Sequence, residues 1–394
     1  MDARPELICF TNYFMGGVAN FWYNILKNDP DNYFTKKVIY LDYNGLHGHT
    51  KLLKKFNLCP ETVFTVDENE HDNVFDVSDR LEKLISHQPG VVLANSHVEL
   101  STLYIHRRPE KKIIFVYHDA LLLETVTRYA SIMNAIICHN PSLYTDLRKA
   151  LPDHAERIHH IPYGIPLPDF IRTVNFNSHL RIVWLARVVK EKGIYDLIGI
   201  DKLLNVAACR VKWTIIGNGP ELSNFKTLVN TEDNFTFFNP VEYSDVLEIV
   251  KNNDIFILPS RIDGLPVALL ETMSVGCVPV ISEFNEGIKE VVKPSIGYVV
   301  EVGNNQAFAD AIVELNNDRE KLSFLGKNAQ STVQRNYNIE IQAKKYFALF
   351  KDVHENAVPV TFGQIQVGGK LDKKIIPRWL RIMLRRVKSG ASTN

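Results

Sequence analysis

The chain has 394 residues, which is too long for one typical domain and suits two. Hydrophobic residues make up 45% of it and charged residues 23%, a composition typical of globular proteins and not of disordered ones. The 45 basic residues balance the 45 acidic ones, which argues against a general nucleic-acid binder, because such proteins need an excess of positive charge.

Short apolar runs rich in Ile, Val and Phe alternate with helical patterns in the first half of the chain. We expect the runs to be strands buried on both faces, and helical patterns such as 18–27 and 77–87 to connect them. This alternation predicts a parallel sheet covered by helices on both sides. The predicted strands are residues 7–11, 38–41, 62–66, 91–95, 113–118, 135–138 and 157–161.

Two prolines and a glycine then interrupt the pattern within the segment YGIPLPDF, residues 163–170. Neither a helix nor a central strand continues through them, so we expect an interdomain linker over residues 164–178. The alternation restarts with predicted strands at 181–186, 212–217, 235–238, 254–259 and 278–282. Two parallel-sheet domains should therefore face each other across a cleft that binds ligands at the carboxyl ends of the strands.

The predicted domains are residues 1–166 and 178–338, and a helical pattern at 339–356 is expected to pack back on the first domain. The remainder, 357–394, contains a basic amphipathic segment at 370–388, where eight lysines and arginines face one acid among interleaved apolar residues. At helical spacing the apolar residues fall on one side, which is typical of an element that lies on an anionic membrane surface. Docking of this helix on the protein's own acidic surface is the alternative. Nucleic-acid binding is disfavoured, because the rest of the chain offers no basic groove.

Features of secreted and membrane-spanning proteins are not found in the sequence. The polar start of the chain does not resemble a signal peptide, and no apolar run approaches the roughly 20 residues of a spanning helix. The five cysteines include no CxxC pair, and three of them lie in apolar, strand-like runs, so we expect buried free thiols in a reducing compartment. The expected location is the cytoplasm, on the inner face of the cell membrane through residues 370–388.

The strongest motif is PSRIDGLPVALLETMSVGCVPVI, residues 259–281, in which seven residues separate the carboxylates of Asp263 and Glu271. A strand ends, a turn forms at DGLP, and a helix begins near residue 267. The N–H groups of Gly264 and Leu265 would lie at the N-terminus of that helix, which favours a diphosphate. A carboxylate on the first turns, at Glu271, can accept hydrogen bonds from a ribose diol.

Two cations five residues apart, Arg187 and Lys192, stand in the second motif, VWLARVVKEKGIYDLI at 183–198. Such cations stabilise the negative charge that builds on a leaving diphosphate. Gly217, in IIGNGPE, marks a strand-to-helix turn. Gly16 and Gly17 follow the first strand, where glycine lets the backbone approach a phosphate or sugar closely.

Together these segments resemble the retaining glycosyltransferase family 4, over roughly residues 7–350. The family more often has Glu where this chain has Asp263. The resemblance implies the GT-B architecture of two Rossmann-like domains, with Asp263 on the transferred sugar and Glu271 on the ribose. It also implies that His118, at a strand end, contacts the donor sugar or the acceptor. The other residues it places at the donor are Gly16, Gly17, Gly217, Val241, Gly264, Leu265 and Pro266.

The reaction implied by this resemblance is transfer of a sugar from a nucleotide sugar to a glycan or lipid-linked acceptor, as in bacterial surface polysaccharide assembly. It proceeds on one face of the sugar, and the leaving phosphate helps to deprotonate the acceptor. No protein nucleophile, cofactor or metal ion is expected. Two alternatives stay open: a sugar-nucleotide epimerase and a non-catalytic sugar-nucleotide binding protein. An NAD-dependent dehydrogenase is disfavoured, because no GxGxxG follows the first strand.

Overall fold

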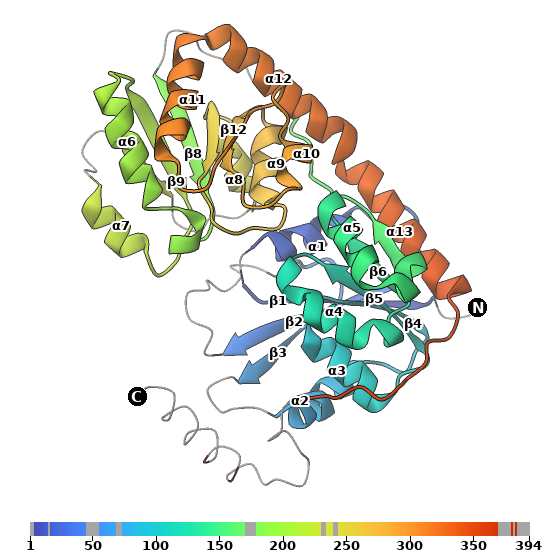
Figure 1. The fold of residues 1–394 in the computed structure, drawn as a ribbon. Helices are drawn as coiled ribbons and strands as arrows, with labels where there is room; N and C mark the ends of the chain where they lie inside the picture. Colours follow the sequence, from blue (N-terminus) through green and yellow to red (C-terminus); the bar gives the residue numbers. More distant parts are fainter. Residues whose placement is uncertain are drawn as a thin grey trace.

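The computed structural model describes residues 4–14, 16–44, 55–67, 73–169, 179–229, 234–238 and 243–368, together with Leu380 and Met383. The described chain forms two parallel sheets, each covered by helices (Figure 1). The first sheet belongs to an N-domain and the second to a C-domain. The predicted architecture of two Rossmann-like domains is therefore confirmed.

The N-domain sheet has seven strands in the order β3-β2-β1-β4-β5-β6-β7. They are β1 (Glu6–Asn12), β2 (Thr35–Asn44), β3 (Glu61–Asp67), β4 (Gly90–Ala94), β5 (Lys111–Tyr117), β6 (Ala135–Cys138) and β7 (Ile158–His160). Its helices are α1 (Gly17–Lys27), α2 (Val74–Leu81), α3 (His97–His106), α4 (Leu123–Tyr129) and α5 (Pro141–Ala150). The short 3₁₀ turns are η1 (Glu82–Leu84), η2 (Ala120–Leu122), η3 (Ala130–Ile132) and η4 (Pro152–Arg157).

The C-domain sheet has six strands in the order β10-β9-β8-β11-β12-β13. They are β8 (Leu180–Leu185), β9 (Val211–Ile216), β10 (Phe235–Phe238), β11 (Ile255–Leu258), β12 (Val278–Ser282) and β13 (Tyr298–Val300). Its helices are α6 (Asp196–Val206), α7 (Leu222–Leu228), α8 (Tyr243–Val250), α9 (Val267–Ser274), α10 (Ile288–Val291), α11 (Asn305–Asn317) and α12 (Arg319–Asn336), and η5 (Lys190–Lys192) is a 3₁₀ turn.

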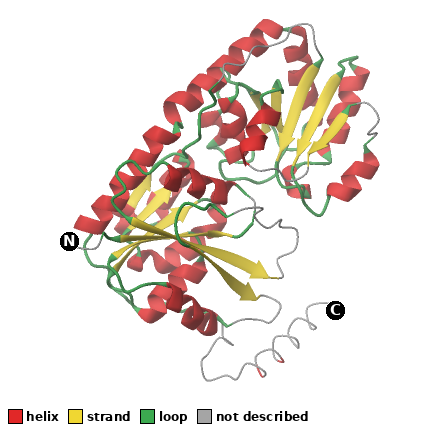
Figure 2. Cartoon of the chain, turned by 180° about the vertical axis from the view of Figure 1, so that it is seen from behind, coloured by secondary structure: helices red, strands yellow, loops and turns green. Residues whose placement is uncertain are grey.

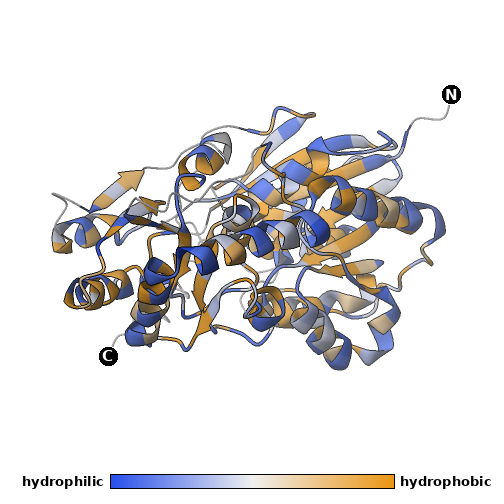
Figure 3. Cartoon of the chain, turned by 90° about the horizontal axis from the view of Figure 1, so that it is seen from above, coloured by the Kyte–Doolittle hydropathy of each residue, from blue (hydrophilic) through white to orange (hydrophobic). Residues whose placement is uncertain are grey.

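Burial explains why these segments are strands. Every residue of β4, β6, β11 and β12 is buried, as expected where helices cover both faces of a parallel sheet. Figure 3 shows the strands as mostly apolar, whereas the helices carry both apolar and polar residues. Helix starts are set by polar caps: the side chains of Ser96 and Asn140 accept hydrogen bonds from the backbone N–H groups of Val98 and Ser142, at 3.2 and 2.7 Å.

The two domains are joined by two chain crossings that lie side by side. Ile165, on the way out of the N-domain, accepts a hydrogen bond from the N–H of Ile339 at 3.1 Å, where the chain returns. The last helix, α13 (Ile339–Asn356), then lies against α1, β4 and β5. Figure 2 shows α12 and α13 following one another along the side of both domains. One buried apolar cluster extends from the N-domain through α13 into the C-domain.

Two elements differ from the sequence predictions. A helix was expected over 77–87, but α2 begins at Val74, because the Asn73 side chain caps the N–H of Phe75, and helical structure ends at Leu84. Beyond it, Arg108 donates to the carbonyl of Ile85 at 3.2 Å, a contact from a distant loop that the local pattern does not contain. Strand β13 was not predicted, since three residues are too few to show a period.

Candidate functional site

The two motifs of the C-domain meet through an ion pair between the loops that follow β8 and β11. The ammonium of Lys192 lies 2.5 Å from a carboxylate oxygen of Asp263 and donates to the carbonyl of Ile262 at 3.2 Å. Both side chains are partly buried, with 20% and 21% of their surface exposed. The cation and the acid that the sequence assigned to a diphosphate and to a sugar are therefore direct neighbours.

Backbone contacts hold these two loops in register. The carbonyl of Glu191 accepts hydrogen bonds from the N–H of Arg261 at 2.8 Å and from the hydroxyl of Ser260 at 3.1 Å. Gly193 has a left-handed φ of 72°, and a Cβ there would lie 2.0 Å from the carbonyl oxygen of Pro259. Only glycine allows this approach, so the position of Lys192 beside the second loop depends on its neighbour in the sequence.

Arg187 lies in an equally tight crossing of backbones at the end of β8. A Cβ on Gly217, whose φ is 147°, would lie 2.0 Å from the carbonyl oxygen of Ala186. The N–H of Val188 donates to the carbonyl of Asn218 at 2.9 Å, so the backbone on both sides of Arg187 is fixed. The Arg187 side chain is exposed. Gly217 was predicted to mark a turn. In the structure it lets the loop after β9 approach the loop after β8 closely.

Asn285, after β12, holds the DGLP turn and was not recognised in the sequence. Its amide donates to the carbonyls of Asp263 and Gly264 at 2.9 and 2.8 Å. The N–H of Gly264 donates to the Asp263 carboxylate at 3.1 Å, so that carboxylate uses one of the donors predicted for a diphosphate. Leu265 is buried, and Pro266 is the N-cap residue of α9. A lone asparagine outside any motif gave no signal for this role.

Glu271, on α9, is the buried acid of the site. Its side chain is 5% exposed, and one carboxylate oxygen has no hydrogen-bond partner among the described residues. Burial raises the pKa of the Glu271 carboxyl to about 7. A buried acceptor without a donor costs free energy, so this carboxyl is suited to a ligand that brings hydroxyl groups.

Residues of the N-domain reach the same turn. A Cβ on Gly264 would lie 2.7 Å from the carbonyl oxygen of His118, at the end of β5. A Cβ on Gly17 would lie 3.0 Å from the side chain of Val267, where α1 and α9 begin. Gly16 has open space around its Cα. The structure thus brings Gly17 and His118 against the DGLP turn and the start of α9.

Both ring nitrogens of His118 have protein partners. Asn95 donates its amide to the carbonyl of Phe10 at 2.5 Å and accepts from the indole of Trp22 at 3.1 Å, which fixes its oxygen toward His118 Nε2, 3.0 Å away. Nε2 must therefore carry the proton, and Nδ1 accepts from the Tyr163 hydroxyl at 3.2 Å. Burial lowers the pKa of His118 to about 3, so the ring is neutral at physiological pH. Contact with a sugar hydroxyl would require one of these hydrogen bonds to break.

Some residues predicted to belong to the site lie outside the described part of the chain. Val241, expected near the base, lies outside the described residues, as does the basic segment 370–388 apart from Leu380 and Met383. Among the residues that are described, no group of three or more His, Cys, Asp or Glu could hold a metal ion. No helix in that part of the chain is long and apolar enough to cross a membrane.

Comparison with known proteins bears on the domain that holds these motifs. Residues 171–332 match the family model described as "Glycosyl transferases group 1". Amylovoran biosynthesis glycosyltransferase AmsK of Erwinia amylovora is 29% identical over 201 residues, 48% of this chain and 49% of that protein. The N,N'-diacetylbacillosaminyl-diphospho-undecaprenol alpha-1,3-N-acetylgalactosaminyltransferase of Campylobacter jejuni is 26% identical over 192 residues, 48% of each chain.

The similarity to these curated relatives thus spans about half of their length. The fold extends further. The crystal structure of Anabaena HepE in complex with UDP and glucose superposes with a TM-score of 0.69 at 15% identity and covers 88% of this chain and 99% of its own. At that identity the superposition concerns the fold, and it confirms a GT-B architecture for the two domains together.

Proposed function

We propose that this protein is a retaining glycosyltransferase that moves a sugar from a nucleotide-sugar donor to a lipid-linked glycan acceptor in bacterial surface polysaccharide assembly. The observation that carries the proposal is the family match over residues 171–332, the segment that contains Arg187, Lys192, Asp263 and Glu271. Relatives named for polysaccharide biosynthesis and for a diphospho-undecaprenol acceptor support the substrate classes.

In this proposal the donor's diphosphate lies beside the two cations. As the glycosidic bond breaks, its electron pair passes to the leaving phosphate oxygen, and Arg187 and Lys192 stabilise the charge that develops there. The Lys192–Asp263 ion pair gives Lys192 a fixed position before the donor binds. Asp263 then faces the transferred sugar, and Glu271 accepts hydrogen bonds from the ribose hydroxyls.

The acceptor hydroxyl attacks on the face from which the phosphate leaves and transfers its proton to that phosphate. The product keeps the anomeric configuration of the donor, no residue forms a covalent bond to the sugar, and no divalent cation takes part. On the N-domain side, the neutral His118 ring, held by Asn95 and Tyr163, positions the end of β5 against the donor turn. The basic segment 370–388 holds the enzyme on the anionic inner face of the cell membrane.

The first test is a thermal-shift screen of the full chain against uridine, guanosine, adenosine and cytidine diphosphates and their sugar conjugates. A ligand at 100 times its Kd stabilises the folded state by about 2.7 kcal/mol. For a domain of this size that free energy raises Tm by roughly 5–10 °C. No shift with any nucleotide would contradict the proposal.

The second test is product analysis with the nucleotide sugar that gives the largest shift. NMR of the product reports the anomeric configuration, and a parallel reaction with EDTA reports metal dependence. Epimerised donor formed without acceptor would identify an epimerase. Nucleotide binding without transfer to any lipid-linked or free glycan would identify a binding protein.

A further inference from the structure

A further contact between the domains lies where the loop after β12, residues 283–287, reaches the start of α5. A Cβ on Gly287 would lie 2.4 Å from Oδ1 and 2.7 Å from Nδ2 of Asn140, so the backbone of this glycine lies against the asparagine side chain. Gly287 precedes α10 in the C-domain, and Asn140 follows β6 in the N-domain. Figure 1 shows α10 and α5 at the junction of the two domains.

The Asn140 side chain is held in place within the N-domain. It is 1% exposed, and its Oδ1 accepts a hydrogen bond from the N–H of Ser142 at 2.7 Å, which caps α5. Its neighbour His139 is also buried and stacks on Tyr163, with ring centroids 3.9 Å apart. The Asn140 amide can therefore yield to a larger residue at position 287 only by breaking the cap of α5.

Glycine at position 287 is explained by this contact and not by the conformation of its own backbone. Its φ of −66° and ψ of −17° are helical values, which alanine adopts readily. The three atoms nearest to a Cβ built on Gly287 all belong to Asn140. A methyl group at this position would therefore disturb the contact between the domains and little else.

The same loop holds the donor turn through Asn285. Its Oδ1 accepts from the N–H of Ile288 at 3.1 Å, and its Nδ2 donates to the carbonyls of Asp263 and Gly264. Because Oδ1 is engaged by α10, the Nδ2 group is the one that faces the DGLP turn. Ile288 is fully buried in the apolar cluster that the two domains share. The position of the turn therefore follows the position of the loop 283–287.

We infer that Asn140 is a positioning residue for the sugar of the donor. It acts through Gly287 and Asn285, which connect it to the turn that carries Asp263. This inference rests on the proposed function, in which Asp263 faces the transferred sugar. Binding of the nucleoside diphosphate should not depend on the contact, because the residues assigned to the ribose and the diphosphate lie on α9 and in the loop after β8.

The test is a pair of substitutions, read by calorimetric titration of the full chain. The probes are one nucleotide sugar, chosen by thermal shift from UDP-glucose, UDP-galactose, UDP-N-acetylglucosamine and GDP-mannose, and its free nucleoside diphosphate. Gly287→Ala should weaken nucleotide-sugar binding about tenfold, as expected for loss of one hydrogen bond to a charged group, and should leave diphosphate binding within about twofold.

A second substitution should reverse this loss. The double variant Gly287→Ala/Asn140→Ser should bind the nucleotide sugar within about threefold of the parent, because serine still caps α5 and leaves room for the methyl group. Asn140→Ser alone should weaken nucleotide-sugar binding less than Gly287→Ala does, since it removes a contact without creating a clash.

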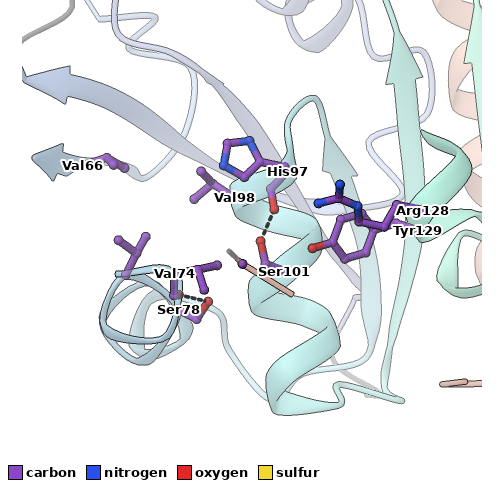
Figure 4. Close-up of a pocket in the computed structure, with 10 residues that line it drawn as sticks. Val66, Val74, Ser78, His97, Val98, Ser101, Arg128 and Tyr129 are labelled. Atoms are coloured by element: carbon purple, nitrogen blue, oxygen red, sulfur yellow. Dashed lines mark hydrogen bonds between the residues drawn. The ribbon is translucent and has the colours of Figure 1, made fainter. Parts of the chain in front are cut away.

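Two matched controls make the same substitutions away from the junction. Gly199→Ala, on α6, would place a Cβ 2.7 Å from the amide nitrogen of Asn305, within the C-domain. Asn73→Ser replaces an asparagine that is also 1% exposed and caps α2 through the N–H of Phe75. The next residue, Val74, lines a cavity between α2 and α3 (Figure 4), and α2 packs in an apolar cluster with no C-domain residue among those described. Both controls should keep both affinities within about twofold of the parent.

The Tm of every variant is measured alongside. Weaker nucleotide-sugar binding in Gly287→Ala, with unchanged diphosphate binding and recovery in the double variant, supports the positioning role. Parent-like nucleotide-sugar binding in Gly287→Ala overturns it, as does an equal loss for both ligands or a double variant that binds no better than Gly287→Ala. Should Gly287→Ala melt far below the parent, the comparison of Asn140→Ser with Asn73→Ser decides, because only the former should weaken nucleotide-sugar binding. Absence of a thermal shift with any nucleotide refutes the proposed function itself.

Discussion

Replacing the buried acid Glu271 by Gln should stabilise the ligand-free protein at alkaline pH and have much less effect at acid pH. Burial raises the pKa of this carboxyl from 4.5 to about 7, so ionising it inside the protein costs about 3 kcal/mol at 1.36 kcal/mol per pKa unit. The folded state binds the proton more tightly than the unfolded state does. The parent is therefore most stable, relative to the variant, below pH 4.5, and loses this advantage as the pH rises to about 7.

Thermal melts of parent and Glu271→Gln at pH 5 and pH 8 measure this effect. Between pH 5 and pH 8 the expected change is about 2.5 kcal/mol, or roughly 5–10 °C in a domain of 150–250 residues, because the unfolded carboxyl is already mostly ionised at pH 5. The Gln amide keeps the shape of the side chain and buries its own polar atoms equally at both pH values. Any change with pH in the Tm difference between variant and parent therefore reports the ionisation of Glu271. The Tm of Glu271→Gln minus that of the parent should rise from pH 5 to pH 8. A value that is equal at the two pH values, or higher at pH 5, would refute the reasoning.

Three further predictions follow from the site and the tail. Arg187→Ala and Lys192→Ala should each lower turnover about 100- to 1000-fold without loss of the fold, because each removes a cation that stabilises the leaving diphosphate; steady-state kinetics and circular dichroism measure both. Glu271→Ala should weaken binding of the free nucleoside diphosphate more than Asp263→Ala does, because this ligand has the ribose that Glu271 contacts but lacks the sugar that Asp263 contacts; calorimetry compares the two. Deletion of residues 370–394 should abolish flotation with anionic liposomes at low salt and spare nucleotide binding.

Each of these measurements has a control and a contrary outcome. Lys190→Ala is matched to Lys192→Ala, since Lys190 is 71% exposed and lies 3.9 Å from Glu221, and it should retain the parent's turnover. Turnover within threefold of the parent in Lys192→Ala would remove that lysine from the mechanism. Equal losses of nucleotide affinity in the two acid variants would contradict their separate roles. Flotation of the truncated chain would show that the tail is not the membrane element.

Local sequence determined the architecture, because each parallel strand is a short apolar run whose burial on both faces leaves a strong pattern. All twelve predicted strands are present, with ends within a few residues, and the helix at 339–356 has the predicted bounds. The motif at 259–281 likewise predicted the turn and the helix start at residue 267. Strand β13 and the true ends of α2 were missed, since a three-residue edge strand and a contact from Arg108 leave no local period.

Tertiary structure decided how the site residues are paired. Nothing in the sequence showed that Lys192 would lie beside Asp263, that Asn285 would hold the donor turn, or that Glu271 would be buried with an unpartnered oxygen.

In the N-domain too, the sequence located a site residue, but only the tertiary structure shows its partners. His118 was recognised at its strand end, but its neutral tautomer follows from Asn95 and Tyr163, which are 23 and 45 residues away along the chain. Periodicity reports which residues one element buries. The partners of a buried polar group depend on how elements distant in sequence pack together.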